Sequence, residues 1–228
     1  MKKIIVSVIA LAFIAITANA QIKEGSITYV MKIEGLAPEQ AAMMGDMDMK
    51  NTFKNGKVLT EMNSMMGTNQ ILIDENGMTM LIDQMGNKIA IKQTKAEMEK
   101  ESAKSKEKLP DPKIEYFPET KMIAGYECKK AIITSTDKNN KEEKIEMWYC
   151  DKFFNPNMEG KGKGQNIMKG LKGMPFEYSG SYGQMKTKIT AKEVSEALVD
   201  EKVFLLSTEG FKTMTMDELK TMQGGKSH

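Results

Sequence analysis

Few side chains in this sequence have the types and spacing that catalysis requires. The only histidine is His228, the last residue, where an untethered imidazole cannot be held in the geometry that base catalysis or metal ligation needs. Every basic residue is a lysine, so the chain lacks the guanidinium fork that grips phosphate or a guanine edge. We therefore expect a protein that is not an enzyme, uses no cofactor and binds no nucleic acid.

The two cysteines, Cys128 and Cys150, are the residues best suited to covalent chemistry. Residues 137–140 have the composition of a turn, and folding the chain about Asn139 places the two cysteines opposite each other across a hairpin. In a secreted chain, this pattern predicts a disulfide between Cys128 and Cys150 rather than a redox or metal pair. The same register gathers a core-facing set on the other face: Ala131, Ile133, Ile145, Met147 and Tyr149.

Ten of the 22 methionines fall between residues 43 and 85, and this concentration allows three interpretations. Flexible thioethers can fill a core, or they can form an adaptable surface for hydrophobic ligands. Alternatively, the spacing of Met47 and Met49 would place both sulfurs on one side of a strand, an arrangement suited to Cu(I). The second interpretation predicts a ligand-binding face formed by Met43, Met49, Phe53, Val58, Met62, Ile73, Met80 and Ile82.

Residues 1–20 have the features of a secretory signal peptide. Lys2 and Lys3 precede an apolar run over residues 4–16, and the small-residue site Ala18-Asn19-Ala20 predicts cleavage between Ala20 and Gln21. The apolar run is shorter than the ~20 residues that span a bilayer. We expect a periplasmic or secreted mature chain without a transmembrane segment, folded as a single β-rich domain over residues 21–222 with a disordered tail at 223–228.

Regularly spaced turn signals predict an antiparallel meander. Closing the turn at Asn55-Gly56 places Phe53 opposite Val58 and Met49 opposite Met62. Two further turns are predicted at Asn76-Gly77 and Gly86-Asn87. They would pair Ile73 with Met80, Ile71 with Ile82, and Ile82 with Ile91.

Other segments complete the predicted sheet and its cover. Helices are expected over residues 38–44 and 96–108, the second beginning at a capping box formed by Thr94 and Glu97. Further strands are expected at residues 26–33, 176–178, 185–191 and 203–206. The loop at residues 161–172 is rich in lysine and glycine, and it could contact anionic lipid headgroups at the envelope membrane.

Four segments together resemble a known family: residues 25–29, 121–130, 147–150 and 173–178. As a set they resemble a secreted family that carries the domain of unknown function DUF4412. More distantly, the predicted architecture is similar to the Lol-type lipoprotein carriers and receptors (LolA and LolB), whose half-barrels hold acyl chains. The arginine with which such carriers latch their lid has no counterpart in this chain.

Together these observations predict a mainly β (α+β) fold, a curved antiparallel half-barrel covered by a few helices. The expected function is binding of a lipid or another hydrophobic molecule in a methionine-rich interior. One alternative is a structural or interaction protein of the cell envelope with a filled core, which meets partners through strand edges or the lysine-rich loop. A second alternative is Cu(I) binding by Met47 and Met49.

Overall fold

A computed structural model describes residues 21–35, 47–65, 67–104, 110–136, 141–155, 168–182 and 185–224. These residues form a 12-stranded sheet in the order β12-β6-β5-β4-β3-β2-β1-β11-β10-β9-β8-β7. The strands are β1 (Glu24–Ile33), β2 (Met47–Lys54), β3 (Lys57–Ser64), β4 (Gly67–Asp74), β5 (Gly77–Gln84), β6 (Asn87–Thr94), β7 (Lys113–Ile123), β8 (Tyr126–Thr136), β9 (Glu142–Cys150), β10 (Met174–Tyr182), β11 (Met185–Ser195) and β12 (Lys212–Met214). The helices are α2 (Lys95–Lys104), the 3₁₀ helix η2 (Glu201–Phe204) and α3 (Met216–Gly224).

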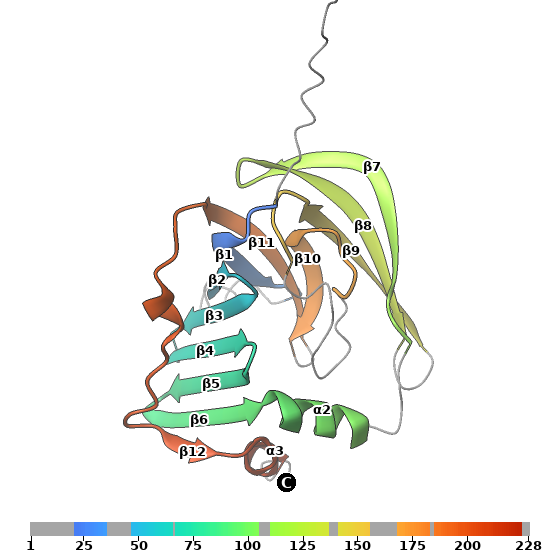
Figure 1. Ribbon diagram of the computed structural model, residues 1–228. Helices are drawn as coiled ribbons and strands as arrows, with labels where there is room; N and C mark the ends of the chain where they lie inside the picture. Colours follow the sequence, from blue (N-terminus) through green and yellow to red (C-terminus); the bar gives the residue numbers. More distant parts are fainter. Residues whose placement is uncertain are drawn as a thin grey trace, which may run out of the picture.

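The sheet consists of two meanders joined by the first strand. Strand β1 pairs with β2 on one side and with β11 on the other, and all pairings are antiparallel except that of β12 with β6. Strands β7–β11 curl over, whereas β2–β6 continue as a flatter wing (Figure 1). The predicted fold class, a curved antiparallel sheet with few helices, is confirmed. No helix in the described ranges has the length and apolar character needed to cross a membrane.

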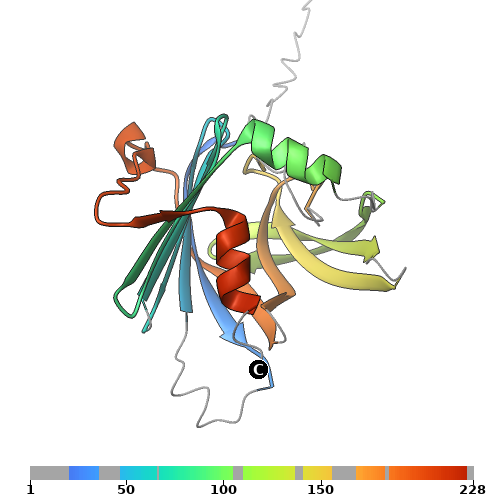
Figure 2. The ribbon, with the colours of Figure 1, turned by 90° about the horizontal axis from the view of Figure 1, so that it is seen from below.

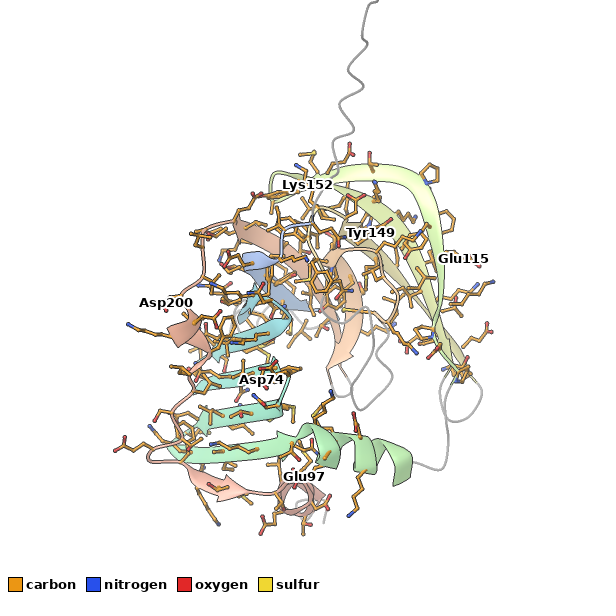
Figure 3. All side chains as sticks on the ribbon, in the orientation of Figure 1. Asp74, Glu97, Glu115, Tyr149, Lys152 and Asp200 are labelled. Carbon is orange, nitrogen blue, oxygen red and sulfur yellow. The ribbon has the colours of Figure 1, made fainter. Side chains whose placement is uncertain are left out.

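The main core fills the curled half of the sheet. Phe153 and Phe176 lie 5.6 Å apart between ring centroids, and Phe153 meets Phe53 of β2 edge-on at 6.2 Å. Aliphatic side chains of β1, including Ile27 and Met31, pack into the same cluster. A neighbouring cluster surrounds Leu171 and contains the predicted core-facing residues Ala131, Ile133, Met147 and Tyr149, and Ile145 is buried as well. Figure 3 shows side chains densely packed around Tyr149.

A second, smaller core lies on the opposite face of the flat wing. Leu59 of β3 and Leu72 of β4 are buried beneath Phe204 of η2, with Val199 and Leu206 packed beside them. Figure 2 shows η2 on one side of the wing and helices α2 and α3 on the other. The strand predicted at residues 203–206 is therefore wrong: Asp200 caps a 3₁₀ turn by accepting a hydrogen bond from the Lys202 backbone N–H at 2.9 Å.

The registers of two predicted hairpins are confirmed. Phe53 faces Val58 and Met49 faces Met62, around a turn in which Asn55 and Gly56 have positive φ. The pairing of β8 with β9 also has the predicted register, as Ile133 faces Ile145. The predicted strand at residues 26–33 is confirmed as part of β1, with Ile27, Tyr29 and Met31 buried.

The predicted registers of the two following hairpins are wrong by two residues. Ile73 faces Met78, Ile71 faces Met80, and Ile82 faces Ile89. In the β4–β5 hairpin, the Asp74 carboxylate accepts hydrogen bonds from the backbone N–H groups of Asn76 and Gly77 at 2.8 and 3.1 Å and so closes the turn earlier. In the β5–β6 hairpin, Met85 and Gly86, both with positive φ, form the turn one position earlier than predicted. Because side chains alternate with a period of two, this even shift keeps the same residues on the same face.

The helical predictions are confirmed in part. Thr94 and Glu97 form the predicted capping box: the Thr94 N–H donates to the Glu97 carboxylate at 2.8 Å, and the Glu97 N–H donates to the Thr94 hydroxyl at 3.3 Å. Helix α2 ends by Lys104, and residues 105–109 lie outside the described ranges. Helix α3 begins at a second capping box, Thr215 with Glu218, and continues through Gln223 and Gly224, the first residues of the predicted tail.

The predicted disulfide is absent, since Cys128 and Cys150 are both free, buried thiols. The register that suggested it is nevertheless correct. A hydrogen bond between the two sulfur groups, together with burial, raises the pKa of Cys128 and favours its protonated form. Cross-strand opposition brings two cysteines together, but a disulfide also needs a specific Cβ–S–S–Cβ dihedral angle.

Candidate ligand-binding face

Apolar side chains from five neighbouring strands form one continuous surface on the side of the flat wing that faces away from η2. We call this surface, made of three rows of cross-strand neighbours, the inner face. It consists of Phe53, Val58, Ile73, Met78 and Gln93; then Asn51, Thr60, Ile71, Met80 and Ile91; and finally Met49, Met62, Asn69, Ile82 and Ile89.

The inner face is apolar but only half-covered. Ile73 is 41% exposed, and half-buried neighbours such as Met80 and Ile82 surround it. On the opposite side of the same strands, Leu59 is 3% and Leu81 is 4% exposed. The leucines of the opposite side are therefore buried, whereas the inner face is fully covered at Ile91, which is 0% exposed, and keeps accessible hydrocarbon around Ile73.

The structure brings most of the predicted ligand-binding residues together on this face. Met49 and Phe53 are buried in the main core and offer little surface to a ligand. Val58 and Met62 pack against that core while remaining half-buried. Ile73, Met80 and Ile82 continue the surface outwards along β4 and β5. Met43 lies outside the described residues.

The sequence interpretation missed the polar groups of the inner face and the leucines behind it. Paired apolar residues such as Val58-Leu59 and Leu81-Ile82 are the signal for the leucines, because neighbouring residues of a strand point to opposite sides and both sides of the wing are then apolar. The three rows contain no charged residue. Asn69 accepts a hydrogen bond from the side-chain amide of Gln84 at 3.3 Å.

A polar contact lies where the inner face meets the main core. The Tyr29 hydroxyl donates to the Pro175 carbonyl oxygen at 2.9 Å. Complete burial raises the pKa of Tyr29 well above its ordinary value of 10.0, and a hydrogen bond with Asn51 partly opposes that shift. Asn51 belongs to the middle row, where it faces Thr60 of β3.

The metal alternative gains no support from acidic or thiol ligands, because the described ranges hold no group of three or more His, Cys, Asp or Glu residues suited to a metal ion. Met47 and Met49 do lie on one side of β2, facing Met31 and Tyr29 of β1. Copper binding by these two thioethers stays a prediction.

Two other surfaces could serve a partner. A pocket of about 380 Å³ opens over β1 and β11 and is formed by Val30, Lys32, Lys188, Thr190, Ala191 and Lys192. Carboxylates partly neutralise it, since Lys188 pairs with Glu177 at 3.3 Å and Lys192 with Asp48 at 3.2 Å. In the lysine-rich loop, residues 161–167 lie outside the described ranges, and Lys169 pairs with Asp111 at 2.6 Å.

No protein-family model matches this chain, and no curated protein matches it either. The resemblance to the DUF4412 family therefore stays an expectation. Among solved structures, that of PNGF-II matches with a TM-score of 0.47 and 16% identity over 88% of this chain. Only 33% of that chain is covered, so the present protein spans about a third of its length.

Two smaller proteins match over most of their own length. LprF from Mycobacterium bovis has a TM-score of 0.34 and 14% identity, with 77% of this chain and 88% of that chain covered. A LolA superfamily protein from Nitrosomonas europaea has a TM-score of 0.35 and 10% identity, with 81% and 91% covered.

Proposed function

We propose that this protein is a non-enzymatic binding protein of the cell envelope that holds a hydrophobic ligand, such as a lipid chain, against the inner face. The observation that carries this proposal is the contrast between the two sides of one wing. The C-terminal segment, residues 196–211, covers the side that contains Leu59 and Leu72. On the inner face, Ile73, Met78 and Met80 remain partly open to solvent. Hydrocarbon left accessible over several adjacent strands is typical of an interaction site.

The composition of the inner face fits a ligand of variable shape. Thioether side chains such as Met62, Met78 and Met80 adapt to different shapes at low energetic cost because they are unbranched and polarizable. The absence of charged side chains from the three rows favours hydrocarbon over an ionic group. Placement in the periplasm, through cleavage after Ala20, is part of the same proposal.

Substitution of Ile73 tests this function. Ile73→Glu places a carboxylate on β4, the central strand of the inner face, and the side chain is exposed enough for the fold to tolerate it. We expect binding of the uncharged hydrocarbon dye diphenylhexatriene to the mature chain to weaken by at least about tenfold, because the ligand would have to desolvate the carboxylate. Dye fluorescence against protein concentration measures the affinity.

Leu198→Glu is the matched control. Leu198 is 85% exposed in the segment after β11, outside the inner face, so this variant adds the same charge in place of another exposed aliphatic side chain. Because Leu198 is more exposed than Ile73 (85% against 41%), its substitution disturbs the fold less, and the variant should bind the dye as the wild type does. Absence of dye binding by the wild type, or equal weakening in both variants, would reject the inner face as a binding site.

The second candidate function is a structural or interaction protein with a filled core. The observation in its favour is that Phe153, Phe176 and Leu171 already occupy the curled half of the sheet. Among the described residues, the interior of the curled half is therefore occupied by side chains rather than by a ligand. If the dye experiment rejects the inner face as a binding site, its result will favour this second function.

A further inference from the structure

One atom on the inner face lacks the hydrogen bond that its burial calls for. The side-chain oxygen Oδ1 of Asn51 is buried and has no hydrogen-bond partner, and it is the one such side-chain oxygen or nitrogen found in the described part of the chain. Buried polar atoms are almost always hydrogen-bonded, because an atom buried without a partner loses the hydrogen bond that it makes with water in the unfolded chain. An orphaned acceptor of this kind indicates a partner from outside the protein, either a water molecule or a group of a ligand.

The contacts of Asn51 fix the orientation of its amide group. Tyr29 uses its only proton on the Pro175 carbonyl oxygen, so the hydrogen bond between Asn51 and Tyr29 must be donated by the Asn51 amide N–H to the Tyr29 oxygen. Nitrogen and oxygen diverge from the same carbon atom. Oδ1 therefore points away from Tyr29, and flipping the amide would place two acceptors against each other.

The position of Asn51 connects this acceptor to the proposed ligand. Along β2 it lies between Met49 and Phe53, and across the sheet its row continues through Thr60 and Ile71 to Met80. The acceptor thus lies at the inner end of a row in which Thr60, Ile71 and Met80 are half-buried. Because Oδ1 itself is covered, a ligand group reaches it only when the half-buried side chains beside it move aside. Asn69, the other asparagine of the inner face, already has its oxygen satisfied by Gln84.

We propose that the ligand of the inner face is a neutral amphiphile with one hydrogen-bond donor, a hydroxyl or an amide N–H, that Asn51 Oδ1 accepts while the hydrocarbon lies along the rows towards Met80. This inference rests on the proposed function. An ammonium group is disfavoured because the three rows contain no carboxylate to balance it. A carboxylate or phosphate is disfavoured because Oδ1 can only accept a hydrogen bond and the rows contain no lysine.

Two compounds with the same chain length separate the donor from the hydrocarbon. 1-Dodecanol carries a hydroxyl donor, whereas dodecyl methyl ether keeps the oxygen and lacks the proton. Each is titrated against the mature protein loaded with diphenylhexatriene, and the loss of fluorescence gives its affinity. We expect the wild type to bind the alcohol about three- to tenfold more tightly than the ether, the range of one neutral hydrogen bond.

Asn51→Leu removes the acceptor at similar volume and should bind alcohol and ether equally. Asn69→Leu is the matched control: it replaces an asparagine on the same face whose oxygen is already paired, and it should keep the wild-type preference. Near-ultraviolet circular dichroism verifies the fold of both variants. The wild-type preference is informative by itself if Asn51→Leu does not fold.

The outcomes distinguish this inference from the proposed function. If both compounds displace the dye from the wild type with equal affinity, the inference of a donor on the ligand is overturned and the proposed function is not. A water molecule would then be the partner of Oδ1. A preference that persists in Asn51→Leu would also overturn the inference of a donor. If the wild type does not bind the dye and neither compound has an effect, both the proposed function and this inference are overturned.

Discussion

At the residue scale, Tyr29 connects the stability of the core to pH. Its side chain is 1% exposed and its hydroxyl is hydrogen-bonded to Pro175 at 2.9 Å. Ionisation would bury a phenolate without a compensating charge, and burial therefore raises its pKa. Tyr126 has a pKa raised to about 12, chiefly because its hydroxyl donates to the Glu196 carboxylate at 2.6 Å.

These shifts predict alkaline destabilisation. Below pH 10, both the folded and unfolded chains hold the tyrosine protons, so the full stability is present. Above pH 10.0, the unfolded chain loses protons that the folded chain keeps, and the free energy of unfolding falls as pH rises through the folded pKa values. Urea unfolding of the wild type between pH 7 and pH 11 should show this fall.

Tyr29→Phe should lower the free energy of unfolding by about 1–3 kcal/mol at pH 7, because it leaves buried polar groups of Pro175 and Asn51 without a partner. The variant should also lose part of the decline above pH 10, while Tyr126 retains its own contribution. A variant whose stability falls as steeply with pH as that of the wild type would contradict the role given to Tyr29.

At the scale of elements, the C-terminal segment determines which side of the flat wing is closed. Lys54 of β2 donates to the Val199 carbonyl oxygen at 2.6 Å, and Lys57 of β3 pairs with Glu201 at 2.7 Å. Phe204 then caps Leu59 and Leu72. Residues 196–211 thus act as a cover that leaves the inner face as the accessible apolar side.

Phe204→Ala should detach this cover. Because Phe204 is only 6% exposed, we expect a loss of about 3–5 kcal/mol in the free energy of unfolding and faster amide hydrogen exchange in β3 and β4. Leu205→Ala is the control, since the neighbouring side chain is 78% exposed and its truncation should cost less than about 0.5 kcal/mol. Equal effects of the two substitutions would show that Phe204 does not anchor the cover.

At the scale of the whole molecule, β1 joins the two meanders and the chain start is anchored to the curled half. The side-chain amide of Gln21 donates to the Asp151 carbonyl oxygen at 3.0 Å, and Ile22 forms a bridge with Phe153. Residues far apart in sequence therefore lie side by side across the middle of the sheet (Figure 1). The predicted cleavage after Ala20 leaves these anchoring contacts intact.

The mass of the protein isolated from the cell envelope tests the proposed processing. We expect a chain that begins at Gln21 in the periplasmic fraction and has lost residues 1–20. A chain that retains Met1 and fractionates with the cytoplasm would contradict both the signal peptide and the proposed location.

Local patterns in the sequence were sufficient to predict much of this fold. The two-residue alternation of β1, the Asn55-Gly56 turn and the β8–β9 register follow from contacts between neighbours in the chain. The capping box at Thr94 is equally local. The predicted β4–β5 register was wrong because the Asp74 carboxylate accepts a hydrogen bond from the Asn76 N–H and closes the turn earlier. The error of two residues leaves the apolar face unchanged.

The tertiary structure alone decided which apolar surface is covered. Alternation separates Leu59 from Val58 but does not say which side will meet Phe204, a residue more than a hundred positions away. The unpaired oxygen of Asn51 likewise depends on the contact of Asn51 with Tyr29 and of Tyr29 with Pro175. These three residues belong to β2, β1 and β10, and the fold brings them together. The sequence by itself determined the strands and the composition of their faces, because these depend on neighbouring residues. Coverage and hydrogen-bond satisfaction depend on long-range packing, which only the folded chain defines.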